Sequence, residues 1–309
     1  MKCLVTGGAG FIGSHLCEQL LKLGYEVGCV DNLITGNKEN ISHLLSNPNF
    51  QFTNHDVTRE LPRDLKADII FHFASPASPP KYIKYARETF LVNTYGSFLL
   101  LEKAVSWHAR FIYASTSEVY GDPQVHPQPE SYWGYVNSAG ERSCYDESKR
   151  AGEALIMSYV RNKSIDAKII RIFNTYGPKM DLNDGRVITN FLREIKNSQP
   201  LSVYGDGKQT RSFCYITDLV DGIIKVMNSS KLDGEIINLG NPEEISILDL
   251  AKLMMNLTEY KGQIKFQDLP PDDPVRRQPD ISKAKTVISW QPLIDLATGL
   301  KKTIAYYLK

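Results

Sequence analysis

The sequence predicts an α/β fold, a Rossmann-type doubly wound parallel sheet with a smaller mixed α/β lobe. Short apolar runs alternate with helical patterns through the first half, which is typical of a parallel sheet covered on both faces. A glycine-rich loop joins the first of these runs to the first helical pattern. A chain of 309 residues with 42% hydrophobic content can bury both units. We therefore expect a first domain over residues 1–173, which a later segment around 212–240 rejoins, and a second lobe mainly over 174–309.

The expected strands are short apolar runs that end near polar residues or glycine. They cover residues 2–6, 25–30, 50–53, 69–74, 111–114 and 167–173. Helical spacing of apolar residues begins after residue 13 and recurs over residues 90–104, 144–162, 187–196, 218–227 and 246–257. Between these elements, residues 203–208 predict a turn, and a proline-rich loop surrounds residues 270–274.

The loop between the first strand and the first helix carries a dinucleotide-binding pattern. Spaced glycines permit a tight turn, close approach of backbone N–H groups to a pyrophosphate, and close packing of helix on strand. The residues expected to contact a cofactor here are Gly7, Gly10, Phe11, Ile12 and Gly13. Such a loop alone is weak support, but its place between a strand and a helix strengthens it.

The second strand ends in an acidic residue, Asp31, followed by Asn32. A carboxylate at this distance from the glycine loop accepts hydrogen bonds from the adenosine ribose. A 2′-phosphate would meet a like charge there, so the sequence favours NAD over NADP.

Polar residues also follow the other strands of the first domain. In a parallel sheet, ligands bind beyond the carboxyl ends of the strands. The residues at such ends are Asp56, Ala74, Ser75, Ser115, Thr116 and Glu118.

Tyr145 and Lys149 lie four residues apart in a helical pattern and therefore share one helix face. A neighbouring cation favours the ionised form of a phenol, so we expect Lys149 to lower the pKa of Tyr145. Tyr145 then becomes a proton acceptor. This spacing also arises by chance, and only the nucleotide site gives it weight.

Composition excludes several classes of partner. A net charge of +1 and scattered Lys and Arg give no footprint for nucleic acid. No run of about 20 apolar residues exists to span a membrane, and no signal sequence precedes the first strand, so we expect a cytoplasmic protein. Five cysteines without paired spacing and dispersed histidines predict reduced thiols and no metal site.

Taken together, these motifs resemble the extended short-chain dehydrogenase/reductase family over essentially the whole chain. The resemblance rests on the Gly7 to Gly13 loop, Asp31, Asp56, the set Thr116, Tyr145 and Lys149, and the run Arg171-Ile-Phe-Asn-Thr-Tyr-Gly-Pro178. Residues 75–82, 115–122 and 272–280 further resemble family members that decarboxylate UDP-glucuronate. The resemblance implies that the first domain binds NAD and the second lobe binds a nucleotide sugar.

A nucleotide-sugar diphosphate needs forked cations and an aromatic surface for its base. Arg186, Arg211, Arg277 and, most weakly, Arg276 are the candidate cations, and Tyr204 could lie against the uracil. The resemblance implies sugar or phosphate contacts for Asn174, diphosphate contacts for Arg211, and contacts of Arg277 with the reacting sugar. It extends the cofactor set to Gly36, Val57, Asn93, Thr175 and Arg186, and the substrate set to Pro76, Ser117, Glu118, Tyr145, Thr189 and Gln209.

The implied reaction converts UDP-glucuronate to UDP-xylose and CO2. Oxidation of C4 to a ketone makes a β-keto acid, which can lose CO2 before C4 is reduced again. Tyr145 would take the C4 hydroxyl proton, Lys149 would hold the nicotinamide ribose, and Thr116 would bind near O4. Glu118 and Arg277 are the candidates for handling the carboxylate and the proton returned to C5.

Three alternatives stay open at this point. Nucleotide-sugar 4,6-dehydratases carry an acidic pair after the threonine, whereas this chain has Ser117 followed by Glu118. A hydroxyl is a much weaker proton donor than a carboxylic acid, which disfavours the dehydratase. A C4 epimerase needs room for the keto-sugar to rotate. A non-catalytic NAD-binding sensor usually loses part of the set that Thr116, Tyr145 and Lys149 complete here.

The resemblance also implies a homodimer that pairs through two helices per subunit, around 90–104 and 144–162. Phe98, Leu99, Leu155 and Ile156 could serve either that interface or the core. Two places depart from the family pattern, Leu91-Val92 before Asn93, and Asp181, where a histidine can occur near the cofactor. Weaker cofactor retention would release a UDP-4-keto-pentose together with NADH.

Overall fold

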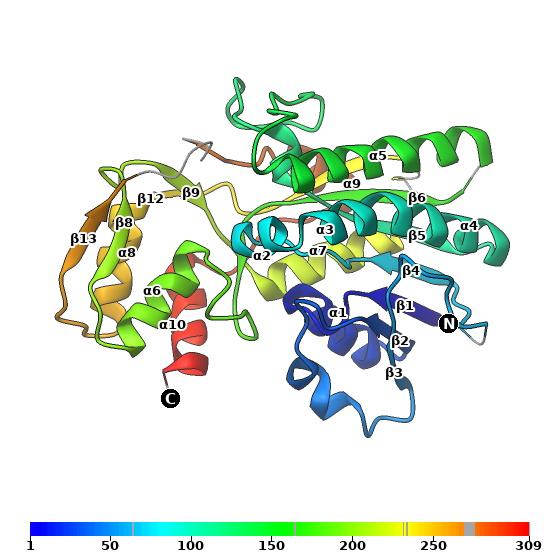
Figure 1. Ribbon diagram of the computed structural model, residues 1–309, viewed down its shortest axis with the longest axis horizontal. Coiled ribbons are helices and arrows are strands. Elements are labelled where there is room, and N and C mark those ends of the chain that lie inside the picture. The colour runs from blue at the N-terminus through cyan, green and yellow to red at the C-terminus, as the bar shows by residue number, and fades with distance from the viewer. Residues whose placement is uncertain (64, 164, 231, 233, 269–275, 309) are drawn as a thin grey trace.

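The fold is built on a seven-stranded, fully parallel sheet in a computed structural model that describes residues 1–63, 65–163, 165–230, 232, 234–268 and 276–308 (Figure 1). Its strand order is β11-β6-β5-β4-β1-β2-β3. The strands are β1 (Lys2–Thr6), β2 (Glu26–Asp31), β3 (Phe50–Asn54), β4 (Ile69–His72), β5 (Arg110–Thr116), β6 (Ala167–Ile172) and β11 (Ile236–Leu239). The order reverses beside β1, which creates the crevice where such sheets bind ligands.

Helices cover both faces of this sheet, as the predicted doubly wound fold requires. Along β1, Cys3 and Val5 join one core cluster and Leu4 joins the other, which is the two-residue alternation of a strand buried on both sides. The first face packs against α1 (Phe11–Lys22) and α7 (Ile216–Asn228). The second packs against α4 (Ser97–Trp107) and α5 (Ser143–Lys163).

Shorter helical segments surround the carboxyl edge of the sheet. They are η1 (Lys38–Leu44), α2 (Pro79–Lys84), α3 (Ala86–Leu91), the π-helical turn η2 (Val92–Gly96) and η3 (Ser117–Tyr120). The helix predicted over residues 90–104 is therefore interrupted, because the π turn separates α3 from α4.

The second lobe lies at the left of Figure 1 and is built from short strand pairs and helices. Its strand pairs are β8 (Leu201–Tyr204) with β13 (Ile264–Gln267), β9 (Thr210–Ser212) with β12 (Glu244–Ser246), and β7 (Thr175–Tyr176) with β10 (Cys214–Tyr215). Its helices are α6 (Val187–Lys196), α8 (Ile247–Leu257) and α10 (Leu296–Tyr307), while α9 (Ser282–Ile288) packs near β11.

The chain returns to the first sheet between these lobe elements, through α7 and β11. Residues 203 and 204, predicted to start a turn over residues 203–208, instead belong to β8, which pairs with β13 more than fifty residues later. The predicted proline-rich loop around residues 270–274 lies outside the described residues. No helix in the described part of the chain is both long and apolar enough to cross a bilayer.

Candidate active site

A large cavity of about 1300 Å³ opens at the carboxyl edge of the sheet, between the sheet and the second lobe. Its walls come from the glycine loop, the ends of β2, β4, β5 and β6, the start of α5, and the lobe residues around β8 and β9. The cavity has the place that the sheet topology predicts for a ligand. Its size suits two bound molecules of cofactor and substrate size.

The glycine loop leaves no room for side chains where it turns. A Cβ on Gly13 would lie 2.2 Å from the carbonyl oxygen of Gly7, and one on Gly7 would lie 2.7 Å from the backbone of Ala74. Gly7 also has a φ of 72°, which favours glycine. The loop backbone thus lies bare against the cavity at the start of α1, which is the arrangement that holds a pyrophosphate.

Replacing Gly13 with alanine is expected to weaken NAD binding about 10- to 100-fold, because relieving the clash with Gly7 costs about 1–3 kcal/mol of loop distortion. Gly28→Ala is the matched control, since a Cβ on Gly28 would meet Leu4 Cδ1 at an ordinary 3.4 Å. Titration calorimetry with NAD measures both variants. Unchanged affinity in Gly13→Ala would exclude this loop from the cofactor site.

Asp31 is fixed at the end of β2 with its carboxylate on the cavity wall. It accepts hydrogen bonds from the N–H groups of Ala9 at 3.0 Å and Leu33 at 2.8 Å. Burial raises the pKa of Asp31, and these two bonds oppose that shift. A Cβ on Gly36 would lie 2.7 Å from Asp31 Oδ1, so the loop after β2 passes close to the carboxylate. These residues fit the ribose end of NAD.

Asp56 lies after β3 and also lines the cavity. Partial burial opposes its ionisation, but hydrogen bonds from the N–H and hydroxyl of Thr58 and from Asn32 hold the pKa of Asp56 below its usual value. An ionised acceptor therefore faces the cavity beside Asp31.

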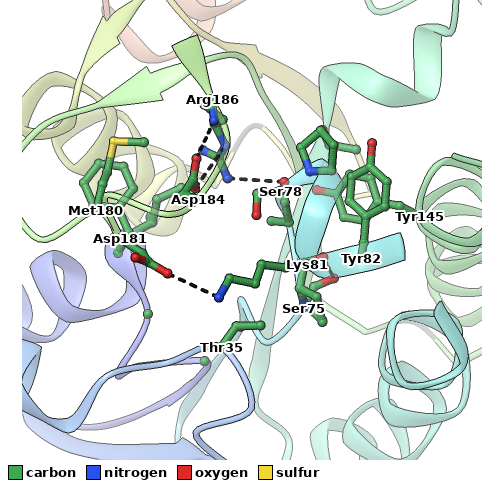
Figure 2. Close-up of a pocket in the computed structure, with 18 of the residues that line it drawn as sticks. Thr35, Ser75, Ser78, Lys81, Tyr82, Tyr145, Met180, Asp181, Asp184 and Arg186 are labelled. Carbon is green, nitrogen blue, oxygen red and sulfur yellow. Dashed lines mark hydrogen bonds and ion pairs between the residues drawn. The ribbon is translucent and has the colours of Figure 1, made fainter. Parts of the chain in front are cut away.

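Tyr145 is buried in the first turn of α5, and its ring stacks on that of Tyr82 (Figure 2). The two ring centroids are 4.9 Å apart and the planes differ by 3°. Burial raises the pKa of Tyr145, and a hydrogen bond with Thr116 only partly opposes this. The sequence predicted a lowered pKa, and that prediction is wrong for the protein alone because loss of hydration outweighs the nearby cations.

Lys149 lies one helical turn beyond Tyr145 and is buried beside it. Its Nζ donates to the carbonyl oxygen of Ala114 at 2.6 Å and lies 4.8 Å from the ring centroid of Tyr113 and 5.9 Å from that of Tyr145. Burial lowers the pKa of Lys149 to about 7, while the charge of Glu153 raises it. The end of β5 and the face of α5 thus bring Thr116, Tyr145 and Lys149 together.

Glu118 accepts hydrogen bonds from two arginines, Arg142 and Arg277, and all three side chains line the cavity. Arg277 is buried and also donates to the carbonyl oxygen of Gly121 at 2.9 Å. Sequence reasoning selected Glu118 and Arg277 but missed Arg142. The sequence held one indication of Arg142. It lies three residues before Tyr145, so its side chain is expected near the same side of the start of α5.

A segment that we call the strap, residues 179–186, connects β7 to α6 along the cavity wall and contacts first-domain residues, and Figure 2 shows Asp181 directed at Lys81. Lys179 Nζ donates to the carbonyl oxygen of Asn40 at 2.9 Å. Asp181 Oδ2 lies 3.3 Å from Lys81 Nζ, and Arg186 donates to the carbonyl oxygen of Ala77 at 3.2 Å. Asp181, a departure from the family pattern, is therefore half of an ion pair between two residues of the cavity wall.

Replacing Lys81 with methionine is expected to speed NADH dissociation about two- to fivefold, because a half-exposed ion pair contributes up to about 1 kcal/mol. The paired reversal K81D/D181K is expected to restore the original rate. Lys84→Met, on the same helix but outside the cavity wall, is the control. Stopped-flow NADH fluorescence provides the measurement. Equal dissociation rates in the parent protein and all three variants would show that the ion pair between Lys81 and Asp181 does not slow the release of NADH.

Most of the residues selected from the sequence line this one cavity. From the cofactor set these are Gly7, Gly10, Phe11, Ile12, Gly13, Asp31, Asn32, Gly36, Asp56, Val57, Ala74, Ser75 and Thr175. From the catalytic and substrate sets they are Pro76, Thr116, Ser117, Glu118, Tyr145, Lys149, Asn174, Arg186, Tyr204, Gln209, Arg211 and Arg277. Arg276 is exposed and lies off the cavity wall.

Two selected residues, Asn93 and Thr189, are buried behind the cavity wall rather than on it. Asn93 donates to the hydroxyls of Ser75 at 3.1 Å and Ser148 at 3.0 Å, so it supports a wall residue from behind. The Thr189 hydroxyl donates to the carbonyl oxygen of Arg186 at 2.8 Å. Within the described ranges, no three His, Cys, Asp or Glu side chains are grouped to hold a metal ion.

Comparison with known proteins identifies related enzymes over the whole chain. The chain is 47% identical over 308 residues to UDP-glucuronic acid decarboxylase 1 of Xenopus tropicalis. The aligned region covers 100% of this chain and 72% of that protein. It is 48% identical over 305 residues to UDP-glucuronic acid decarboxylase 1 of Arabidopsis thaliana. Here the aligned region covers 99% of this chain and 69% of that protein.

Solved structures of related enzymes share the fold. UDP-glucuronic acid 4-epimerase from Bacillus cereus, in complex with UDP-glucuronic acid and NAD, gives a TM-score of 0.90 at 32% identity, over 100% of this chain and 99% of that one. A dTDP-glucose 4,6-dehydratase from Streptomyces venezuelae with NAD and TYD bound gives 0.91 at 29% identity, over 100% and 97%.

The family profile agrees with both sets of relatives and confirms the resemblance seen in the sequence. Residues 3–240 match the NAD dependent epimerase/dehydratase family. The chain therefore belongs to the NAD-dependent epimerase/dehydratase family, and its cofactor is NAD.

Proposed function

We infer that the protein is a UDP-glucuronate decarboxylase, which converts UDP-glucuronate to UDP-xylose and CO2 with NAD as a resident cofactor. The observation that carries this conclusion is the position of Glu118 between Arg142 and Arg277, in the same cavity as Thr116, Tyr145 and Lys149. Two guanidinium groups that can bind a substrate carboxylate therefore lie in the same cavity as the residues expected to oxidise C4. Relatives at 47–48% identity over nearly the whole chain are decarboxylases of this substrate.

The chemistry requires an electron sink beside the carboxylate. A carboxyl group on C5 of the sugar cannot leave readily, because the electrons of its bond to C5 have no acceptor. A ketone at C4 accepts them as an enolate, so oxidation must come first. When bound, NAD supplies the exchange of a hydride with C4.

Tyr145 is the group that we assign to the proton on the C4 hydroxyl. It is buried at the cavity wall with Thr116 as its hydrogen-bond partner, and Tyr82 fixes the orientation of its ring. Lys149 lies behind it and, when protonated, stabilises the tyrosinate. The same lysine is placed to hold the nicotinamide ribose through its remaining N–H groups.

Arg142 and Arg277 are assigned to the substrate carboxylate and Glu118 to the proton that returns to C5. Two guanidinium groups can orient the carboxylate until CO2 leaves. Once CO2 has departed, Glu118 holds or directs the water that supplies the proton at C5. The buried Nε of Arg277 has no partner among the described residues, so this arginine keeps a free donor next to the cavity.

The nucleotide half of the substrate is assigned to the second lobe. Tyr204, Gln209 and Arg211 come from β8, β9 and the turn between them, and all three line the cavity. Tyr204 is partly exposed and offers a ring for the uracil, while Arg211 offers a forked cation for the diphosphate. Asn174 and Arg186 line the same cavity.

The runner-up functions share the oxidation step and differ in the fate of the keto-sugar. Ser117, where dehydratases place an acid, is buried and lines the cavity, and a hydroxyl there cannot protonate a leaving hydroxide at neutral pH. Incubation with UDP-glucuronate and catalytic NAD, followed by proton NMR, is expected to show UDP-xylose. Signals of a 6-deoxy-4-keto sugar or of UDP-galacturonate would overturn the assignment, and NAD binding without turnover would indicate a sensor.

A homodimer through α3, α4 and α5 is proposed from the family resemblance and from exposed apolar side chains. Phe90, Tyr95 and Phe98 are 44%, 49% and 40% exposed along this face, and Tyr95 stacks on Phe98. Of the earlier interface candidates, Ile156 is buried in the monomer core. Sedimentation velocity of Tyr95→Arg is expected to show a monomer if this face pairs. The cytoplasmic location stays a prediction.

A further inference from the structure

A buried ion pair lies one helical turn beyond Lys149 on α5. Arg171 on β6 donates to both carboxylate oxygens of Glu153 on α5, at 2.9 Å and 2.7 Å. The two side chains belong to residues that are 7% and 8% exposed. Glu153 is four residues beyond Lys149 and therefore lies on the same face of α5, one turn further from the cavity.

This pair is connected to the reaction site through β5. The Ser115 hydroxyl donates to Glu153 Oε1 at 2.5 Å. Ser115 separates Ala114, whose carbonyl oxygen accepts from Lys149, from Thr116, the partner of Tyr145. The carboxylate thus ties the ends of β5 and β6 to the helix face that carries the two reacting groups.

A buried ion pair is an expensive way to fill a core, because desolvation of both charges offsets their attraction. Apolar residues of similar size would give comparable stability. The core stability of this position therefore does not require charges, and Lys149 is the ionisable group on which the charge of Glu153 acts.

The charged and titratable groups around Lys149 leave Glu153 as its source of negative charge in the described part of the chain. On β4, burial lowers the pKa of His72 to about 3, so the imidazole is neutral. Burial raises the pKa of the Tyr113 phenol on β5 and of Tyr145 on α5, so both are neutral without cofactor. Arg171, on β6, is paired with Glu153.

We propose that Glu153, held by Arg171 and Ser115, is a positioning residue that keeps Lys149 protonated while Tyr145 exchanges its proton. This role rests on the proposed function, since it assigns a task within that reaction. Lys149 must carry its proton to stabilise the tyrosinate, so activity falls as pH rises through the pKa of Lys149. Loss of the Glu153 charge lowers that pKa and moves the fall to lower pH.

The test is the pH profile of kcat/KM for CO2 release by the NAD-loaded enzyme, in the parent protein and in Glu153→Gln and Glu153→Asp. Glu153→Gln is expected to move the alkaline limb down by roughly one pH unit. Glu153→Asp keeps the charge and should move it less. Glu147→Gln removes a carboxylate from the same helix, on the face that pairs with Arg150, and should leave the limb in place.

A uniform loss of rate in Glu153→Gln with an unmoved alkaline limb would show a merely structural role and overturn the proposal. A second readout does not depend on turnover: NMR titration of 15N-labelled lysine side chains, with Lys149→Met identifying the Lys149 signal. The pH at the midpoint of the Lys149 titration should fall in Glu153→Gln, and an unchanged midpoint would also overturn the proposal. Absence of CO2 release by the parent protein would instead reject the proposed function.

If Glu153→Gln does not fold because Arg171 is left unpaired, the double variant E153Q/R171Q removes both charges. The shift is expected in the same direction, because Glu153 is the charge that raises the pKa of Lys149. An alkaline limb identical to that of the parent protein in the folded double variant would contradict the inference.

Discussion

Tyr145→Phe is expected to lower the rate of CO2 release from UDP-glucuronate by about 10²- to 10⁴-fold, which is the usual contribution of a positioned proton acceptor. Phenylalanine keeps the ring that stacks on Tyr82 and removes only the oxygen that Thr116 contacts. Since oxidation at C4 precedes every later step, the variant should also fail to form NADH in a single turnover. Trapped 14CO2 and absorbance at the NADH band measure the two effects.

Tyr159→Phe is the matched control for this variant. Tyr159 lies on the same helix, donates to Glu102, and does not line the cavity. Its hydroxyl should be dispensable for turnover even if the protein loses some stability. Equal rates of CO2 release in Tyr145→Phe and Tyr159→Phe would show that Tyr145 does not act in the reaction. The route through oxidation at C4 would then have to be abandoned.

Arg277→Met is expected to separate the two halves of the reaction. Loss of one preorganised donor at a developing charge costs about 10²- to 10³-fold in rate. Arg277 is buried and donates to Glu118, whereas the hydrogen-bond partner of Tyr145 is Thr116, so C4 oxidation should persist while CO2 release falls. Rapid-quench analysis should therefore reveal NADH and a 4-keto-glucuronate that accumulates, which the Tyr145→Phe enzyme cannot produce.

Arg276→Met provides the comparison for Arg277, because it removes the same charge from the neighbouring, exposed position. Its rate should match that of the parent enzyme within about twofold, as for an ordinary surface substitution. Equal loss of NADH formation and CO2 release in Arg277→Met would indicate that this arginine binds the substrate as a whole and has no particular role in decarboxylation.

Much of the site was predictable from the sequence because its parts are local. The glycine loop, Asp31 and the Tyr145 and Lys149 pair each depend on spacing within one strand, turn or helix. Tyr82 was missed because it stacks on Tyr145, which lies 63 positions away along the chain. Arg142 lies close to Tyr145 in the sequence, but its contact with Glu118 spans 24 positions. No periodicity in the sequence encodes such contacts.

The wrong direction for the pKa of Tyr145 has a related cause. Spacing revealed the neighbouring cation but not the burial of the phenol, which is a property of the whole packed site. The burial of Asn93 and Thr189 likewise depends on which way η2 and α6 turn against the sheet. The β8 and β13 pair could not be predicted because its partners are separated by more than fifty residues.

The chain path through α7 and β11 limits how this enzyme can be recombined. Residues 216–239 lie between two stretches of the second lobe in sequence, yet β11 forms the edge of the main sheet beside β6. Truncation after residue 173 would strip that edge and uncover β6. An exchange of nucleotide-sugar specificity with a relative must therefore transplant residues 174–215 and 240–308 as two separate inserts and leave the native segment between them.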